Sequence, residues 1–333
     1  MAFLSPLGIN TFPFTIQSQK NGSHLHLATT HQRKPSALKT LKIPIPRNHV
    51  LNLNTMIPLR ALQTPEESSG ISGVVSGLLD PIGASIPTWE SAIVCNLLIF
   101  LVGFPILVSG LSASGIGAAF LLGVLTWRAF GASGFLLVAI YFIIGTAATK
   151  LKIAQKEAQG VAEQRRGRRG PGSVIGSSAA GCFCAFLSIY GIGGSQLSAL
   201  WQLGFVASFC TKLSDTVSSE IGKAYGKTTY LVTTLKVVPK GTEGAVSFEG
   251  TVAGFIASVI LASISCFLGK IHVAEVVICV IASQVANFGE SLIGAALQEK
   301  EGFKWLNNDA VNVINISMGS ALAILMQQLV LQI

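Results

Sequence analysis

Residues 214–227 combine acidic, hydroxyl and basic side chains directly after a long apolar stretch. Asp215 and Glu220 lie five residues apart, and two Gly-Lys pairs that end in Lys223 and Lys227 follow them. Carboxylates at a membrane edge can hold Mg²⁺, which takes one or two carboxylates together with phosphate oxygens. The lysines supply positive charge for phosphate, and the glycines let the backbone approach it closely. The spacing is consistent with a site for phosphate and metal. It fits about equally well a solvated loop whose lysines extend to the membrane surface.

The next stretch repeats this combination. Residues 230–238 are rich in β-branched side chains, which indicates a short strand or an extended arm. A turn that carries cations, a hydroxyl group and a carboxylate follows it. The candidate phosphate-binding residues of this stretch are Lys236, Lys240, Thr242 and Glu243. Two clusters of acid and lysine in one connection suit a polyphosphate with its metal better than a monovalent ligand.

A run of arginines precedes these clusters in the chain and consists of Arg165, Arg166, Arg168 and Arg169. Such a run commonly fixes the topology of a membrane protein by facing anionic lipid. The alternative is a direct phosphate clamp. It is supported by the expectation that the run lies on the same side of the membrane as Asp215.

Polar residues also recur every three or four positions in the last two apolar stretches. The first stripe holds Gln284, Asn287, Ser291, Gly294 and Gln298 with Glu290 beside it, and the second holds Asn308, Asn312, Asn315 and Gly319 with Asp309 at its head. Polar groups inside a membrane are costly and normally face a cavity or the bundle interior. We therefore expect the two stripes to face one another, either as interhelical hydrogen bonds or as a pocket for a headgroup or phosphate. The candidate pocket residues are Asn287, Glu290, Asn308, Asp309 and Asn312.

Long runs without charge predict the elements that must position these residues. Half of the 333 residues are hydrophobic and 11% are charged, whereas a soluble domain carries about 25% charged residues. A membrane core of about 30 Å takes about 20 helical residues. We therefore predict an all-α polytopic membrane protein with about six to eight transmembrane helices. The eight predicted spans are 90–110, 113–129, 131–149, 174–191, 195–213, 248–269, 272–296 and 310–331, with turns near 110–115 and 191–194.

Three polar segments separate these spans, and they comprise residues 150–173, 214–247 and 298–309. Two spans lie between each segment and the next, so all three emerge on one side of the membrane. The first segment carries a net charge of +5, and the positive-inside rule places this side in the stroma of a plastid. Within the spans, glycines such as Gly250 and Gly254 predict close helix packing.

The N-terminal part has a different composition. Residues 1–65 hold seven Lys or Arg and no acid, so the net charge of +8 falls to +1 without them. A basic, Ser- and Thr-rich start without an apolar core is typical of an organellar address. We predict a plastid transit peptide in 1–60, a Gly- and Ser-rich linker in 61–89 and the helical domain in 90–333. Nucleic-acid binding has no support once the leader is removed.

Two other classes of site are not indicated. The six cysteines lie within apolar runs and form no C-x-x-C pair, which argues against a disulfide framework or a zinc site. His272 is the single histidine after the leader and has no serine motif around it, so hydrolase chemistry is not expected.

The loop motifs resemble those of known families. Asp215-Thr216, Gly222-Lys223-x-x-Gly226-Lys227 and Pro239-Lys240-Gly241-Thr242-Glu243-Gly244 resemble the signature of CTP-using membrane enzymes such as polyprenol kinases and CDP-diacylglycerol synthases, although Gly241 stands where a second lysine is common. More closely, Ser214–Glu220, Gly241–Gly250, Arg169-Gly170-Pro171 and Asn307–Asn312 look like a separate integral-membrane family that includes the plastid phytyl-phosphate kinase of tocopherol synthesis. The resemblance covers residues 90–333.

The resemblance implies a kinase with a phosphate group as acceptor. It would convert phytyl monophosphate to phytyl diphosphate with a nucleoside triphosphate, expected to be CTP, for tocopherol and prenyl-lipid synthesis and phytol salvage. Its partners would be an isoprenoid phosphate, a nucleotide and the lipid bilayer of a chloroplast membrane, expected to be the envelope. Mg²⁺ would lie on Asp215, with Glu220 or Glu243 as a second acid. Lys223, Lys227, Lys236 and Lys240 would neutralise the polyphosphate, and Arg165–Arg169 with Asn308 and Asp309 would lie near the acceptor phosphate.

Three alternatives remain open at this point. A prenol kinase would act on the alcohol and would need a base for its hydroxyl group. A nucleotidyltransferase that makes a CDP-lipid would use the same loop motif. A membrane transporter would use the polar stripes as a pathway and would not need a polyphosphate loop.

Overall fold

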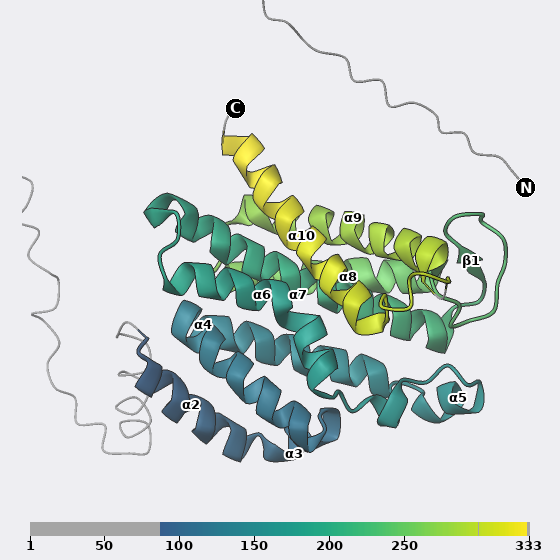
Figure 1. The fold of residues 1–333 in the computed structure, drawn as a ribbon, viewed down its shortest axis with the longest axis horizontal. Helices are drawn as coiled ribbons and strands as arrows, with labels where there is room; N and C mark the ends of the chain where they lie inside the picture. Colours follow the sequence, from purple (N-terminus) through teal and green to yellow (C-terminus); the bar gives the residue numbers. More distant parts are fainter. Residues whose placement is uncertain (1–86, 299, 332–333) are drawn as a thin grey trace, which may run out of the picture. The chain divides into compact units, whose positions relative to one another are not determined.

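The computed structural model describes residues 87–331 except residue 299, and these residues belong to one compact unit of the chain. The predicted transit peptide, and all of the predicted linker before residue 87, lie outside the described residues. The elements in chain order are α2 (Trp89–Val102), α3 (Phe104–Gly110), α4 (Ala113–Lys150), α5 (Ile153–Ala158), the 3₁₀ turn η1 (Gln164–Gly167), α6 (Pro171–Ile189), α7 (Gly194–Tyr225), β1 (Thr229–Leu231), β2 (Ala245–Ser247), α8 (Phe248–Phe267), α9 (Val273–Leu297) and α10 (Asn308–Leu331) (Figure 1).

The helical membrane architecture is confirmed. Five of the described helices are long and apolar enough to cross a membrane, namely α4, α6, α8, α9 and α10. The pair α2–α3 would add a sixth crossing if it counts as one span, because the two helices are bent by 79° at Gly103. The sequence predicted about six to eight membrane spans. The number is lower here because two predicted spans form the single bent helix α4, and because α7 is not among the helices that are apolar enough.

Helix α4 reverses direction at Gly131, which has a φ of +70° that an L side chain rarely adopts. Arg169 identifies the reversal, because its carbonyl group lies against Gly115 in the first arm and its guanidinium group lies against Gly145 in the second. The rings of Trp127 and Phe135 pack 5.6 Å apart on either side of the turn. The two arms correspond to the predicted spans 113–129 and 131–149.

Helix α7 lies at the centre of the bundle and contacts α4, α6, α8, α9 and α10. Its residues 205–214 are buried throughout. A helix that is surrounded by protein needs no lipid-facing apolar surface, which explains why its sequence is less apolar than that of its neighbours. The predicted close packing is confirmed, because a Cβ atom on Gly250 or Gly254 of α8 would lie within 2.7 Å of a backbone carbonyl oxygen of α7.

The predicted boundaries of the polar segments need correction. Residues 214–225 are not a loop, because α7 continues to Tyr225 and ends at Gly226. The helix continues because several of its side chains here, among them Ser214, Thr216 and Glu220, are buried against neighbouring elements. Of the short strand or extended arm predicted over 230–238, the structure has the short strand, β1, which begins at Thr229 and ends at Leu231; Thr229 pairs antiparallel with Ser247. The first segment contains α5 and η1 rather than a continuous loop.

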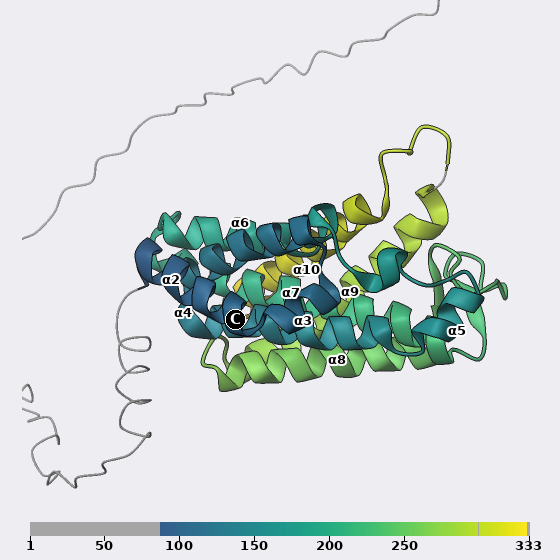
Figure 2. The same ribbon diagram turned by 90° about the horizontal axis from the view of Figure 1, so that it is seen from below.

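The three polar segments lie at the same end of the bundle, as the sequence predicted. In both views, α5, the β1 hairpin and the connection from α9 to α10 gather at one end (Figures 1 and 2). They surround one cavity, which contains the candidate site.

Candidate active site

A polar cavity of about 840 Å³ opens between α6, α7, α9, α10 and the three polar segments. Most of the predicted site residues line it. They are Asp215, Glu220, Lys223, Lys240, Thr242, Glu243, Arg165, Arg168, Arg169, Asn287, Glu290, Asn308, Asp309 and Asn312. Residues that are more than a hundred positions apart in the chain thus face one another.

Three predicted residues do not line the cavity. Lys227 and Lys236 are exposed and lie outside it. Arg166 is also exposed, and its Nε donates to Glu157 Oε1 at 3.0 Å. Their positions argue for surface roles outside the site.

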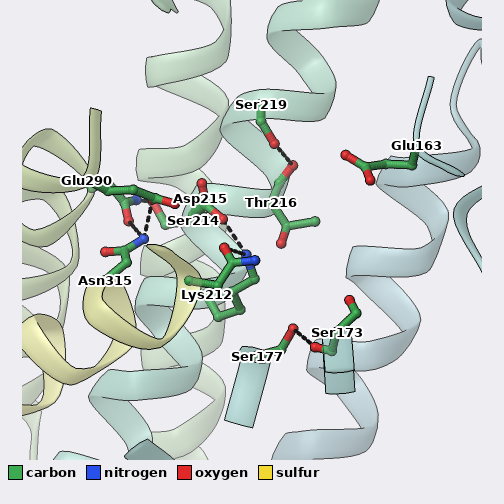
Figure 3. A network of polar contacts seen from close by, with 12 residues as sticks. Glu163, Ser173, Ser177, Lys212, Ser214, Asp215, Thr216, Ser219, Glu290 and Asn315 are labelled. Atoms are coloured by element: carbon green, nitrogen blue, oxygen red, sulfur yellow. Dashed lines mark hydrogen bonds and ion pairs between the residues drawn. The ribbon is translucent and has the colours of Figure 1, made fainter. Parts of the chain in front are cut away.

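Lys212 lies at the inner end of the cavity and connects two helices. Its Nζ donates to Asp215 Oδ2 at 2.5 Å and to Asn312 Oδ1 at 2.5 Å. The side chain is buried away from water, and its charge is balanced by the carboxylate of Asp215. Figure 3 shows Lys212 and Asp215 pointing toward one another.

The two polar stripes of α9 and α10 face one another, as predicted. Asn315 Nδ2 donates to Asn287 Oδ1 at 3.0 Å and also to the Glu290 carboxylate. Asn287 in turn donates to Ser214 Oγ of α7 at 2.8 Å. The stripes therefore hold α7, α9 and α10 together around Glu290, whose carboxylate is within hydrogen-bonding reach of Asp215 (Figure 3).

Glu220 and Lys223 are one turn further along α7 and contact the first polar segment. Glu220 accepts from Lys156, which is fully buried and also donates to the Thr149 carbonyl oxygen at 2.7 Å. Burial raises the pKa of Glu220, and the nearby lysines oppose this rise. Lys223 donates to Glu163 Oε1 at 3.1 Å.

The charge of Lys223 is stabilised by its surroundings. Burial alone would lower its pKa, but the carboxylates of Glu163 and Glu220 outweigh this effect, so the pKa is raised above its usual value. Lys223 is therefore a persistent cation at the wall of the cavity. Lys240 Nζ lies 3.5 Å from the Lys223 carbonyl oxygen, which places a second cation beside it.

Arginines also line the cavity, next to the N-terminus of α6. Arg169 donates to the Tyr141 hydroxyl group at 3.2 Å, and its backbone joins the ends of α3 and α4. Arg165 has a positive φ of 52°, an uncommon conformation that holds it in a tight turn before α6. Asp309 of α10 lies against Gly172 in the first turn of α6. Cations from α7, from the connection between β1 and β2 and from the segment before α6 thus share the cavity with the carboxylates.

The carboxylates fit one class of metal ion. In the part of the chain that the structure describes, no group of three or more His, Cys, Asp or Glu side chains could hold an ion by itself. Asp215 and Glu290 do lie together, and Mg²⁺ typically takes one or two carboxylates with the remaining positions filled by water and phosphate oxygens. The residues present therefore fit a magnesium–phosphate complex better than a stand-alone metal site.

Comparison with known proteins places this architecture in a family. The model of the integral membrane protein family DUF92 matches residues 96–320. The chain belongs to the DUF92 family. It is 69% identical over 265 residues to protein VTE6, chloroplastic, of Arabidopsis thaliana, with 80% of each chain covered. It is 46% identical to an uncharacterized membrane protein of Synechocystis over 71% of this chain and 90% of that protein.

A third relative is an uncharacterized membrane protein of Methanocaldococcus jannaschii, which is 32% identical over 57% of this chain and 74% of the relative. No solved structure matches. The DUF92 match extends from α2 into α10 and thus includes every helix that lines the cavity. The similarity to the chloroplastic relative and the apolar helices identify the chain as a chloroplast membrane protein, and the family to which the loop motifs pointed is confirmed.

Two buried lysines that hold site carboxylates in place escaped the sequence analysis. Lys212 is the first charge after the apolar run 170–211, and its only signal is that it lies three residues before Asp215 on a helix. Lys156 belongs to a basic segment in which nothing distinguishes a buried lysine from its exposed neighbours. Their roles follow from contacts with residues that are remote in the chain.

Proposed function

We propose that this protein transfers the γ-phosphoryl group of a nucleoside triphosphate, CTP, to phytyl monophosphate. The products are phytyl diphosphate and the nucleoside diphosphate. The observation that carries the proposal is the cavity in which the Asp215 and Glu290 carboxylates lie among the cations at the polar end of membrane helices. The relationship to VTE6 supports a role in the tocopherol pathway, and the loop motifs support CTP.

The chemistry asks little of a general base. The second pKa of a phosphate monoester is about 6, so the attacking oxygen is already largely ionised at neutral pH. A new bond forms between this oxygen and the γ-phosphorus, and the bond from the γ-phosphorus to the β–γ bridging oxygen breaks. Catalysis then depends on positioning and on stabilising charge, which is what a ring of fixed cations supplies.

We assign the metal to Asp215 and Glu290, with Glu243 beside them. This differs from the sequence expectation of Asp215 with Glu243, because Glu290 is the carboxylate that lies next to Asp215. Mg²⁺ held by these residues would supply positive charge that neutralises the polyphosphate. Lys212 holds the Asp215 carboxylate in place through its hydrogen bond and contributes positive charge at the inner wall.

The two groups of cations suit the two phosphate groups. Lys223 and Lys240, with Thr242, come from α7 and the connection between β1 and β2 and would hold the triphosphate. Arg165, Arg168 and Arg169 come from the segment before α6 and would hold the acceptor phosphate. Arginine suits a terminal phosphate because its planar group binds two oxygens at once. Two anions that would repel one another in water are thereby brought together.

The orientation follows from the charge of the polar end. The positive-inside rule places α5, the hairpin and the α9–α10 connection on the stromal side, and we propose the envelope as the membrane. Soluble nucleotide would then enter the cavity from the stroma, and the isoprenoid acceptor would enter from the bilayer.

The proposal predicts a specific product. The mature protein, purified in detergent and given phytyl monophosphate, Mg²⁺ and CTP, is expected to form phytyl diphosphate and CDP in equal amounts, as measured by mass spectrometry. Parallel reactions with ATP, GTP and UTP define the nucleotide, and a reaction with phytol in place of the monophosphate tests a prenol kinase. Release of pyrophosphate with formation of a CDP-lipid would contradict the proposal in favour of a nucleotidyltransferase.

A further inference from the structure

A second cavity of about 200 Å³ lies between α2, α3, both arms of α4 and α6. Its lining is almost entirely aliphatic and aromatic, and it includes Phe100, Leu107, Leu122, Val138, Phe142 and Val174. Its few polar side chains are near one end and include Arg169, Ser177 and Ser178. An apolar cavity of this kind takes a hydrocarbon rather than a polar metabolite.

The apolar cavity adjoins the polar one. Arg169 and Ser177 line both cavities, so these two side chains stand at the junction. Arg169 is held there by its hydrogen bond to the Tyr141 hydroxyl group at 3.2 Å, and Tyr141 lines the apolar side. A ligand with a phosphate at Arg169 and a hydrocarbon chain attached directly to it would occupy both cavities.

The apolar cavity is also accessible from the bilayer. Its lining residues Ile99, Ile106 and Ile143 are between 39% and 51% exposed, so one side of it borders the lipid-facing surface. The broken pair α2–α3 covers it and packs mainly against α4 among the helices of the bundle. A chain that is too long for the cavity can therefore extend between the helices into lipid.

We propose that this cavity binds the isoprenoid chain of the acceptor next to its phosphate, an inference that rests on the proposed function. The first isoprene units lie against α3, α4 and α6, and the remainder of the chain lies in the bilayer. The occupant is a single-chain phosphate monoester, because the apolar lining begins beside Arg169. A glycerophospholipid would have to place its ester groups and a second chain at this point.

Filling the cavity is expected to weaken binding of long acceptors selectively. Ala139 lines the cavity from the second arm of α4, and Ala139→Phe would occupy the space of the chain. We expect the KM for phytyl monophosphate to rise at least tenfold, whereas the KM for CTP and for the five-carbon acceptor dimethylallyl monophosphate changes less than twofold. The matched control is Ala147→Phe on the same arm, which is exposed and lines neither cavity.

Equal KM values for phytyl monophosphate in the two variants would overturn the inference while the proposed function stands.

A second measurement needs neither turnover nor a variant. Wild-type protein in detergent is labelled with a phytyl monophosphate that carries a diazirine on its first isoprene unit, and the modified peptides are mapped by mass spectrometry. Labels within α3, α4 and α6 support the inference, also where no product forms. Labels confined to α8 or α9, or displacement by phosphatidic acid as readily as by unlabelled phytyl monophosphate, contradict it.

Discussion

Replacing Asp215 with asparagine is expected to reduce the turnover number for phytyl diphosphate by about a thousandfold or more. Loss of one preorganised group that stabilises charge in the transition state typically costs 10²–10³ in rate, and Asp215 is assigned to the metal as well. The fold should persist, because the asparagine oxygen can still accept the hydrogen bond that Lys212 Nζ donates at 2.5 Å in the wild-type protein. The measurement is the rate of product formation with saturating CTP, Mg²⁺ and acceptor.

The control for this variant is Glu157→Gln, which removes an exposed carboxylate outside the cavity. It should retain wild-type turnover. Thermal unfolding of both variants in the same detergent checks that the loss is chemical rather than structural. Wild-type turnover in the folded Asp215→Asn protein would remove Asp215 from the metal site.

The second large effect is on stability and concerns the ion pair of Lys156 with Glu220. Both side chains are almost completely buried, so removal of one leaves an uncompensated charge. Lys156→Met is expected to destabilise the folded state by about 3–5 kcal/mol. The measurement is the midpoint of thermal or denaturant unfolding in detergent.

The matched variant replaces both partners, as Lys156→Met with Glu220→Met. Since replacement of a buried pair by apolar residues of similar volume is often neutral or stabilising, most of the lost stability should return. The same variant tests the catalytic role that the sequence predicted for Glu220. Substantial turnover in the stable double variant indicates that Glu220 positions α5 against α7, and loss of turnover at full stability indicates a direct role.

The helices were predictable because a bilayer imposes a simple rule on composition. Charge-free runs marked the apolar helices, and the turns expected near 110–115 and 191–194 lie between α3 and α4 and between α6 and α7. The facing stripes of α9 and α10 were also predictable, because polar side chains at helical spacing within a membrane must find partners. The helices and the stripes could be predicted because each depends only on the local sequence pattern and on the uniformly apolar environment of the bilayer.

The end of α7 could not be predicted in this way. Residues 214–225 are polar enough to read as a loop, and they are helical because neighbouring elements bury one face and supply its partners. Asn312 for Lys212 and Lys156 for Glu220 come from helices that are remote in the chain. The same limitation hid Glu290 as the neighbour of Asp215, since their proximity depends on how α7 and α9 cross.

The most direct test of a shared nucleotide and metal site is equilibrium binding of radiolabelled CTP to the purified protein in detergent. We predict saturable binding of one CTP per chain that weakens at least tenfold when Mg²⁺ is chelated, and that weakens similarly in Asp215→Asn with Mg²⁺ present. Absence of saturable binding of CTP, ATP, GTP and UTP, with or without Mg²⁺, would contradict the account.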